Sequence, residues 1–553
     1  MHKRGDDIVK VLIIGGVAAG TKVAAKLKRE DRSCEVTILT SSKEISYAGC
    51  GLPYYVGEVI QEKSALIVNT PQSFSRLTGA EVLTEMEATA IDREAKVVKA
   101  RSLKDGQEQE FSYDKLVLAT GASPIRPNLP GMDLEHVFYM RTPEDAYALR
   151  DAVNEIPAKR AVVVGGGFIG LEVAENLAAR GVRVSVIDMA EHTLPGFDPE
   201  IAEYVENRLA DAGIMVFPGT KLEGLEGDGK VEKVLTSRRR MKADLVVMSI
   251  GIRPNTAFLE GSGIERNPNG TVAVNAQMQT NDENIYAVGD CASVTNRITG
   301  KTVWSPMGSS ANIEGRRTAK NMAGENRPYA GVLGTGVCKL PGMNVGRTGL
   351  SETQVLEAGF YPVSVVCVVD DKAHYYPGAG SFVIKMTADA ETGKFLGVQA
   401  VGQGAVDKIV DIAVTALTLK ADLSQLEDMD LAYAPPFSTA IHPFSQAVNI
   451  LENKMAGELE TMSPKEYLDG KAEGWRVIDC GMTPSIEGAQ YLDVAEIQGE
   501  VPGIAKDEKI LLVCAKGKRA YLTQNRLKYY GYTNTKVLEG GTTFNGTELY
   551  PEE

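Results

Sequence analysis

The sequence predicts an α/β protein of several domains, and three observations support this fold class. At 553 residues the chain is too long for a single hydrophobic core, so we expect three or four domains. Two glycine-rich turns, beginning at Gly15 and Gly165, each join an apolar strand to a helical pattern. Near the C-terminus a third apolar strand ends in a cysteine, and a short basic loop leads from it into a helix. Strands that alternate with helices favour parallel sheets.

The first glycine-rich turn lies in a strand–helix–strand unit. Residues 9–14 (VKVLII) predict a strand, residues 21–30 a helix, and residues 36–39 a second strand. Small residues in such a turn let the chain approach a pyrophosphate at the helix N-terminus. Val17 replaces the middle glycine of the usual pattern, and the second strand ends in Thr40, where an acidic ribose ligand is expected. The candidate cofactor-binding residues are Gly15, Val17, Ala18, Gly20 and Thr40.

The second turn matches the dinucleotide fingerprint at every position. Residues 161–164 form the strand, Gly165, Gly167 and Gly170 stand in the turn, and Asp188 ends the next strand. A carboxylate there accepts a hydrogen bond from a ribose 2′-hydroxyl and repels a 2′-phosphate, which favours NADH over NADPH.

Two such units imply two bound dinucleotides, and further stretches indicate that one is a flavin. Residues 116–124 (LVLATGASP) and 244–255 (DLVVMSIGIRPN) each read as a strand that ends near a glycine and returns the chain between domains; they add Thr120, Gly121 and Gly251 to the candidate cofactor-binding residues. Thr280 is followed by Tyr286-Ala287-Val288-Gly289-Asp290. This combination resembles the two-dinucleotide flavoprotein disulfide reductases over residues 8–455.

The resemblance implies a domain plan. It places an FAD domain at 1–118 and 245–328, with Asp290 contacting the FAD ribitol, and an NAD domain at 119–244. It also implies an α+β dimerisation domain at 329–455 and therefore a homodimer.

The stretch SYAGCGLPYY (46–55) contains one cysteine, Cys50, where most members of that family carry two as C-x4-C. Tyr55 stands at the second position. A lone cysteine beside a flavin needs an outside partner, which is either the oxygen of a sulfenic acid or a small thiol in a mixed disulfide. Members that use the sulfenic acid carry a histidine in the first glycine-rich turn, and the turn GGVAAGT has none, which disfavours that route.

The same stretch resembles the coenzyme A disulfide reductases, in which this cysteine forms a mixed disulfide with CoA. That resemblance implies that Tyr375 and Tyr433 of the partner subunit reach the site, where their hydroxyls would hydrogen-bond the thiolate or protonate the leaving thiolate; interface packing is the alternative role. Ser46 matches a substrate-contacting serine. Gly49 does not match, since asparagine is usual at this position.

A basic stripe follows the first helix. Lys22, Lys26 and Arg29 recur at i, i+4 and i+7, and the resemblance implies a basic residue for CoA at Arg29. The stripe is a candidate site for the CoA phosphates, and a solvated helix face explains it about equally well.

The C-terminal region predicts a fourth domain. After a linker at 456–470, residues 471–553 resemble the small α/β single-domain rhodaneses, whose loop wraps a sulfur with backbone N–H groups. Cys514 is the implied persulfide carrier, and its loop is Ala515, Lys516, Gly517, Lys518 and Arg519. Asp479 begins that family's upstream signature, but Cys480 follows it and the next segment is shortened, so transferase activity is left open. We interpret Cys480 as a small core residue rather than a resolving thiol.

Composition excludes several classes of function. The formal net charge of −14 argues against nucleic acid and anionic membranes as partners, and no apolar run reaches the roughly 20 residues of a membrane span. The seven cysteines show neither C-x-x-C pairs nor zinc-ligand spacing, which predicts free thiols in a reducing, cytoplasmic compartment and no metal. We expect Cys34, Cys338 and Cys367 in the core and Cys291 packed under the flavin.

The sequence therefore predicts an FAD-dependent enzyme that reduces CoA disulfide, CoA persulfide or polysulfide with NADH through Cys50, while Cys514 handles sulfane sulfur. The alternatives are an NADH oxidase or peroxidase that uses a Cys50 sulfenic acid, a reductase of a redox partner protein, and a redox sensor that does not turn over.

Overall fold

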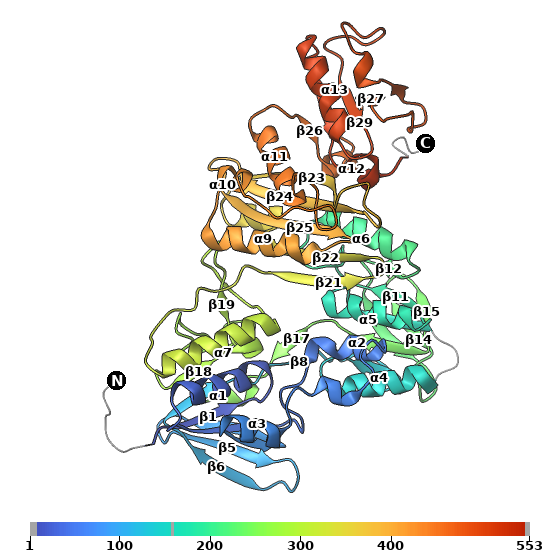
Figure 1. Ribbon diagram of the computed structural model, residues 1–553. Coiled ribbons are helices and arrows are strands. Elements are labelled where there is room, and N and C mark those ends of the chain that lie inside the picture. Colours follow the sequence, from blue (N-terminus) through green and yellow to red (C-terminus); the bar gives the residue numbers. More distant parts are fainter. Residues whose placement is uncertain (1–7, 156–159, 548–553) are drawn as a thin grey trace. The chain divides into compact units, whose positions relative to one another are not determined.

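The computed structural model describes residues 8–155 and 160–547, and the chain divides into two compact units (Figure 1). The first unit consists of the residues up to 191 together with 213–332. The second consists of 192–212 and the residues from 333 onward. Within the described residues, no helix combines the length and the apolar character that crossing a membrane requires.

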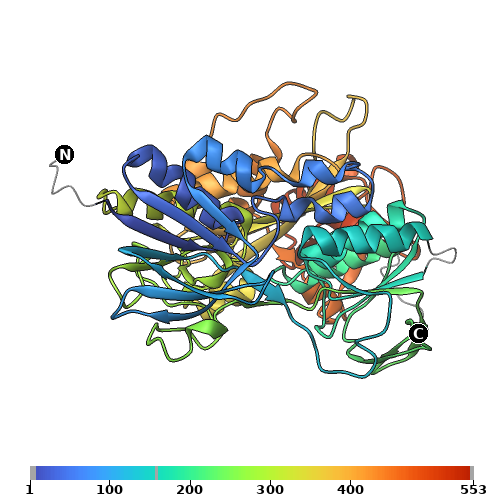
Figure 2. The ribbon, with the colours of Figure 1, turned by 90° about the horizontal axis from the view of Figure 1, so that it is seen from below.

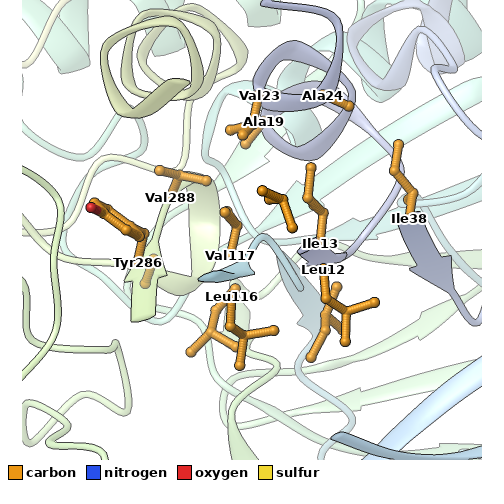
Figure 3. Close-up of a cluster of buried hydrophobic side chains, with 14 of the residues drawn as sticks. Leu12, Ile13, Ala19, Val23, Ala24, Ile38, Leu116, Val117, Tyr286 and Val288 are labelled. Carbon is orange, nitrogen blue, oxygen red and sulfur yellow. The ribbon is translucent and has the colours of Figure 1, made fainter. Parts of the chain in front are cut away.

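The core of the first unit begins with a parallel sheet in the order β18-β7-β1-β2-β3. Its strands are β1 (Lys10–Ile14), β2 (Glu35–Thr40), β3 (Glu81–Thr84), β7 (Lys115–Leu118) and β18 (Ile285–Ala287). The continuous apolar run of β1 fits a strand that is covered on both faces. Helices α1 (Ala18–Glu30) and α7 (Gly308–Met322) pack against each other. Figure 3 shows Ala19, Val23 and Ala24 of α1 above the strands that carry Ile13 and Val117.

Smaller elements surround this sheet. Between β3 and β7 the chain forms an antiparallel meander of β4 (Met86–Asp92), β5 (Val97–Ser102) and β6 (Glu108–Ser112). Helix α3 (Pro71–Thr78) packs near β3. The return of the chain at β18, far along the sequence from β7, agrees with the predicted two-part FAD domain. The predicted strands at 9–14 and 36–39 and the helix at 21–30 are confirmed, with each element shifted by a few residues at most.

The second parallel sheet of this unit has the order β12-β11-β10-β16-β9. Its strands are β9 (Val137–Tyr139), β10 (Arg160–Val164), β11 (Arg183–Ile187), β12 (Met215–Phe217) and β16 (Leu245–Met248). Helices α2 (Leu52–Val56), α4 (Pro143–Glu155) and α5 (Phe168–Ala179) lie side by side (Figures 1 and 2). A three-stranded antiparallel sheet completes this part, with β13 (Leu222–Glu226), β14 (Lys233–Thr236) and β15 (Arg240–Lys242).

The predicted domain boundary after residue 244 lies too early. Strand β16 begins at Leu245 and pairs with β10 and β9, so it belongs to the second sheet. The chain crosses between the two sheets afterwards, through β17 (Ile252–Pro254), which pairs antiparallel with β8 (Ala122–Pro124). The sequence pattern shows where a strand ends but does not show which neighbour it pairs with.

The second unit is built on an antiparallel sheet in the order β21-β22-β25-β24-β23. Its strands are β21 (Gly336–Leu340), β22 (Met343–Gly349), β23 (Pro362–Asp370), β24 (Ser381–Asp389) and β25 (Phe395–Gly402), and the helices are α8 (Glu352–Glu357), α9 (Val406–Leu419), α10 (Leu423–Glu427) and α11 (Pro443–Met455). Helix α9 packs on β22 and β25, and α11 packs on β23 and β24.

Helix α6 (Pro199–Asp211) belongs to this unit, although its sequence lies inside the predicted NAD domain. A buried ion cluster accounts for this. The Lys385 ammonium of β24 lies 3.0 Å from Asp198 Oδ2, 2.5 Å from Glu200 Oε1 and 3.2 Å from Glu352 Oε2. Lys385 is 1% exposed, so these contacts are its replacement for water. Burial alone would lower the pKa of Lys385, but the three carboxylates outweigh it and hold that pKa above its ordinary value.

The C-terminal domain contains a parallel sheet in the order β26-β30-β29-β27-β28. Its elements are β26 (Thr461–Met462), α12 (Pro464–Leu468), β27 (Arg476–Asp479), β28 (Gln490–Tyr491), β29 (Ile510–Val513), α13 (Lys518–Tyr529), β30 (Thr535–Leu538) and α14 (Gly541–Asn545). The predicted linker at 456–470 is wrong for residues 461–468. They form β26, which pairs with β30, and α12, which a Ser463–Glu466 capping box begins.

Candidate active site

The two glycine-rich turns of the first unit have nearly the same geometry. The backbone φ angle is +115° at Gly15 and +110° at Gly165. A Cβ at Gly15 would lie 2.0 Å from the carbonyl oxygen of Ala119, and a Cβ at Gly165 would lie 2.2 Å from that of Ser249. Glycine is therefore required at each position for two reasons: the φ angle is positive, and a neighbouring backbone carbonyl leaves no room for a Cβ.

The two following helices begin within their glycine-rich turns, at Ala18 and at Phe168. A Cβ at Gly20 or Gly170 would lie within 2.0 Å of the first glycine's carbonyl oxygen in the same turn, so each helix can start close against its strand. Among the described residues, neither the Val17 N-cap of α1 nor the Gly167 N-cap of α5 caps its helix with a side chain, and neither first turn carries an acid. Uncapped helix starts of this kind, the first opening at Ala18, fit the phosphates of two dinucleotides.

The ends of the second strands differ between the two turns. Asp188 accepts hydrogen bonds from the N–H of Gly166 at 2.6 Å and of Ala190 at 2.8 Å, which fixes its carboxylate beside the second turn. Thr40 is buried at the end of β2, and its hydroxyl accepts from the N–H of Ser42 at 3.4 Å. Only the second turn therefore carries a fixed negative charge at the position expected for a ribose ligand.

The two crossover segments are tied together at the predicted residues. The Thr120 hydroxyl donates to the carbonyl of Asn255 at 2.8 Å, and the Asn255 amide donates back to the Thr120 carbonyl at 3.0 Å. Gly121 (φ +65°) and Gly251 (φ +105°) make the turns at either end of the β8–β17 pair. These residues fix the path of the chain between the sheets.

Asp290 lies in a turn after β18, and the sequence did not reveal its partner. Its Oδ2 atom is 2.6 Å from Nη2 of Arg141, in a half-buried ion pair. The adjacent Gly289 N–H donates to the Glu314 carboxylate at 2.6 Å, and burial raises the pKa of Glu314 to about 7. Neither Arg141 nor Glu314 stands in a recognisable motif, so only the fold brings them to Asp290.

Cys50 occupies a short 3-10 turn, Gly49–Gly51, that leads directly into α2. It is exposed, whereas the other six cysteines are buried. The Arg180 guanidinium donates to the Val56 carbonyl at 3.1 Å, and Arg150 lies 4.3 Å above the ring of Tyr55, so α2 is anchored to the second sheet's helices. A Cβ at Gly49 would meet its nearest atom, a ring carbon of Tyr47, only at 4.0 Å, so this position can accept a side chain.

An acid that the sequence analysis missed lies near this cysteine. Glu172, in the first turns of α5, accepts a hydrogen bond from the Tyr54 hydroxyl at 3.1 Å. Burial raises the pKa of Glu172 to about 7, although the Tyr54 hydrogen bond opposes the shift. The pKa of the Cys50 thiol is also raised, first because neighbouring protein atoms displace part of its water and then because of the charge of Glu172. Glu172 is one of two acids on a largely apolar helix, which was the available signal.

We predict that Glu172→Gln lowers the pKa of Cys50. The change removes a negative charge that opposes the thiolate, so the thiolate should form at lower pH, and the difference should grow above pH 7, where Glu172 is ionised. The measurement is the rate of Cys50 alkylation against pH, read by peptide mapping of the purified protein. Glu108→Gln, an exposed acid on β6 of the same unit, is the control, and equal profiles for wild type and Glu172→Gln would contradict the coupling.

Ser46 has an unusual backbone for its residue type. Its φ is +49°, a region that serine rarely adopts. Its N–H donates to the Gly16 carbonyl at 2.9 Å, and its hydroxyl accepts from the Asn69 side chain at 3.4 Å. The strained residue therefore lies against the first glycine-rich turn, four positions before Cys50.

The basic stripe of α1 is not uniform. Lys26 pairs with Glu30 one turn later, whereas Arg29 is exposed and Lys22 packs against α7, where a Cβ at Gly315 would lie 3.0 Å from the Lys22 Cβ. Part of the positive charge is therefore compensated within the helix. Arg29 is the member best placed to meet an anion from solvent.

Tyr375 and Tyr433 lie together on the second unit. They come from separate loops, 66% and 49% exposed respectively, and a hydrogen bond to Tyr375 raises the pKa of Tyr433. The two exposed phenol rings therefore form a hydrogen-bonded pair at the surface of this unit.

The predicted sulfur-binding loop closes around Cys514 at the carboxyl end of β29. The Cys514 sulfur accepts from the N–H of Ala520 at 3.4 Å, and the loop turns at Gly517, whose φ is +85°. The carbonyls of Cys514 and Ala515 accept from the N–H groups of Thr542 and Thr543 at 3.1 and 3.0 Å. The N–H of Ala520, in the first turn of α13, is therefore directed at the sulfur.

The charges of this loop are arranged differently from our expectation. A basic loop next to Cys514 suggests positive charge near the sulfur, but the Lys516 ammonium lies 2.5 Å from Asp370 and 2.8 Å from the Ser381 hydroxyl. Lys518 is exposed. Arg519 donates to the Cys480 carbonyl at 3.0 Å and pairs with Asp493 at 3.0 Å. The buried cysteines include the four predicted core residues, Cys34, Cys338, Cys367 and Cys480, and also Cys291, below Asp290.

Family models match most of the chain. Residues 9–315 match the pyridine nucleotide-disulphide oxidoreductase model, residues 337–443 match the dimerisation domain of that family, and residues 446–543 match the rhodanese-like domain. The match to the rhodanese-like model begins before the predicted linker at 456–470, so it includes β26, which pairs with β30.

Relatives and solved structures cover either the first four-fifths or the whole of the chain. An NADH oxidase of Methanocaldococcus jannaschii is 36% identical over 81% of this chain and 100% of its own, and a CoA-dependent NAD(P)H sulfur oxidoreductase of Pyrococcus abyssi is 36% identical over 80% and 98%. Two structures extend over the C-terminal domain as well. The reduced CoADR-RHD of Bacillus anthracis has a TM-score of 0.93 at 30% identity, covering 98% of both chains. An NAD-dependent persulfide reductase of A. fulgidus has a TM-score of 0.92 at 34% identity, covering 97% and 99%.

Proposed function

The chain belongs to the pyridine nucleotide-disulphide oxidoreductase family and carries a rhodanese-like C-terminal domain, and we propose that it reduces CoA disulfide, CoA persulfide or polysulfide with NADH. One observation carries this proposal. Cys50 is the one exposed cysteine of the seven, and it lies in the unit that holds both dinucleotide turns. Because the other six cysteines are buried, we assign its redox partner to a small thiol that enters from solution.

The cofactors follow from the family and from the two turns. The family uses FAD and NAD(P)H, and the uncapped starts of α1 and α5 fit both. When bound, FAD carries two electrons from the nicotinamide to the sulfur centre. We assign FAD to Gly15–Gly20 and Asp290, and NADH to Gly165–Gly170, because the fixed carboxylate of Asp188 would repel the 2′-phosphate of NADPH.

The residues of the chain then have definite roles. The Cys50 thiolate attacks one sulfur of CoA disulfide and forms a Cys50–CoA mixed disulfide, and the other CoA leaves as a thiolate. Tyr433 of the partner subunit, hydrogen-bonded to Tyr375 of the partner subunit, gives a proton to that thiolate. Two-electron reduction of the mixed disulfide releases the second CoA and restores the Cys50 thiolate. With CoA persulfide as substrate, hydrosulfide is the group that leaves.

The remaining contacts concern the substrate. Ser46, held in its strained conformation by Gly16, would contact the thiol end of CoA, and Arg29 would contact its phosphates. The proposal includes a homodimer, because the tyrosine pair must come from a second copy, and a cytoplasmic location, because all seven cysteines are free thiols.

Mass spectrometry of the protein as purified tests this function. We expect a CoA adduct on the peptide that contains Cys50, bound FAD, and rapid NADH oxidation on addition of CoA disulfide or CoA persulfide. Fast NADH oxidation by O2 or H2O2 without any CoA compound would overturn the proposal and favour an oxidase or peroxidase with a Cys50 sulfenic acid. A stable thiol-dependent complex with a protein, together with inactivity on CoA compounds, would favour a reductase of a partner protein.

The C-terminal domain gives a selective prediction. Cys514→Ser should leave NADH-dependent reduction of CoA disulfide within about 2-fold of wild type, because this reaction needs only Cys50. The same change should lower the rate with polysulfide by at least about 10-fold, because the loop around Cys514 is then unable to carry sulfane sulfur. The two rates are measured side by side, and Cys338→Ser in the dimerisation domain is the control. Equal loss in both assays would indicate a structural role for the loop.

A further inference from the structure

Cys480 and Cys514 occupy adjacent positions in the C-terminal sheet. Strand β27 pairs in parallel with β29, from Arg476 opposite Ile510 to Asp479 opposite Val513. The next residue on each strand is a cysteine, and the N–H of Cys480 continues the ladder by donating to the Val513 carbonyl at 2.7 Å. Neighbouring strands lie about 4.8 Å apart. That separation falls within the range of roughly 4.4–6.8 Å between the Cα atoms of a disulfide.

Both side chains lie on the same face of the sheet. Alternate residues of a strand point to opposite faces, and residues that face each other across a ladder share a face. The residues of one face form one buried cluster: Ile478, Cys480, Ile510, Leu512 and Cys514. The intervening residues Val477, Leu511 and Val513 belong to a separate cluster. The two sulfur atoms are therefore neighbours across one ladder, on the side covered by α13.

The surroundings hold this arrangement and isolate it from solvent. Cys480 is 0% exposed and Cys514 is 3% exposed. Arg519, in the first turn of α13, donates to the Cys480 carbonyl at 3.0 Å, while the N–H of Ala520 in the same turn donates to the Cys514 sulfur. Burial, together with the charge of Cys514, raises the pKa of Cys480 to about 12, so Cys480 keeps its proton at neutral pH. One helix start therefore contacts both cysteines.

We propose that Cys480 is the resolving thiol of Cys514. This rests on the proposed function, because it begins from a sulfane sulfur on Cys514. The Cys480 sulfur attacks the inner sulfur of the Cys514 persulfide. A Cys480–Cys514 bond forms, the bond to the outer sulfur breaks, and hydrosulfide leaves with the electron pair and the proton of Cys480. The outer sulfur is reduced and Cys480 is oxidised, so no further oxidant is needed.

The cycle closes through chemistry that the rest of the chain supplies. Two molecules of a small thiol such as CoA reduce the Cys480–Cys514 disulfide and are themselves oxidised to a CoA disulfide. That disulfide is the substrate proposed for Cys50. The C-terminal domain thereby reduces sulfane sulfur to hydrosulfide and produces CoA disulfide, which NADH then reduces through Cys50. No persulfide has to pass from Cys514 to the reductase site.

The experiment uses the full-length protein with Cys50→Ser, so that the reductase cysteine does not react. The reduced protein is treated anaerobically with polysulfide, without NADH or thiol, and mapped by mass spectrometry under non-reducing conditions. We expect the peptides of Cys480 and Cys514 to be joined and hydrosulfide to be released. In a Cys480→Ser version, Cys514 should keep an added sulfur, and hydrosulfide release should fall at least about 10-fold. Cys367→Ser, which removes another buried cysteine of the same unit, is the matched control.

A second arm separates this inference from the proposed function. The same protein is equilibrated with mixtures of reduced and oxidised glutathione, which tests the cysteine pair without any persulfide. If Cys514 takes up no sulfur from polysulfide but the disulfide forms in glutathione, the proposed role of the domain fails and the cysteine pair stands. A stable persulfide on Cys514 with no Cys480–Cys514 disulfide in either arm would overturn the inference.

Discussion

Replacement of Cys50 by serine is expected to lower NADH-dependent turnover of CoA disulfide and CoA persulfide by at least about 10³-fold. A serine hydroxyl is not ionised near neutral pH and does not form a mixed disulfide, so the first bond-forming step is lost for both substrates. Both dinucleotide turns lie outside the short segment that carries Cys50, so FAD content and NADH binding should be unchanged. The measurement is the steady-state rate with each substrate, together with the flavin spectrum.

The control for this variant is another cysteine of the same unit. Cys34→Ser changes a buried cysteine next to β2 and should keep wild-type turnover. Turnover retained by Cys50→Ser with either CoA compound would remove Cys50 from the mechanism. Loss of FAD from the variant would instead show that the stretch around Cys50 supports the flavin site, and the rates would then be compared per bound FAD.

Lys385→Met is expected to give the largest loss of stability. The change removes the buried ammonium that lies within 3.2 Å of Asp198, Glu200 and Glu352, so these carboxylates lose their shared ion-pair partner. Removing one partner of a buried ion pair costs about 3–5 kcal/mol, because the remaining charge stays out of water. The measurement is the free energy of unfolding in urea, with protease resistance of the second unit as an independent reading.

A surface ion pair of the same unit supplies the comparison. Lys465 lies 2.8 Å from Asp469, and both side chains are about half exposed. Lys465→Met should therefore leave stability unchanged within error. Equal stability of wild type and Lys385→Met would mean that the carboxylates take up protons or reach water when the lysine is absent, and the cluster would then have no part in holding α6.

The sequence predicted those features that a local pattern specifies. The sequence identified four glycines of the two turns: Gly15, Gly20, Gly165 and Gly170. Close approach of the backbone allows no other residue at these positions, and the resulting pattern lies within a short stretch of sequence. The candidate role of Cys514 followed from the resemblance of its loop to that of the rhodaneses, which is also a short local pattern. The alternation of strands and helices predicted the parallel sheets.

The remaining features depend on contacts between distant segments. Glu172 reaches the region of Cys50 only because α5 packs beside α2, and Arg141 reaches Asp290 across more than a hundred residues of sequence. The boundary near residue 245 and the supposed linker were wrong because the partner of a short strand is not encoded in the strand itself. The partner of Lys516 could not be predicted either, because its ammonium pairs with Asp370, a residue far away in the sequence.

The contact between Lys516 and Asp370 limits how the C-terminal domain can be expressed alone or exchanged with that of a relative. Glu539, at the end of β30, is 3% exposed; it accepts from the Val366 N–H at 2.8 Å and from the Lys454 ammonium at 2.7 Å, both on the dimerisation domain. A C-terminal fragment expressed alone would carry Glu539 and Lys516 without these partners. A grafted tail from a relative would need matching side chains at 370 and 454. The tail and the dimerisation domain are therefore expected to change together among homologues, as a single unit of recombination.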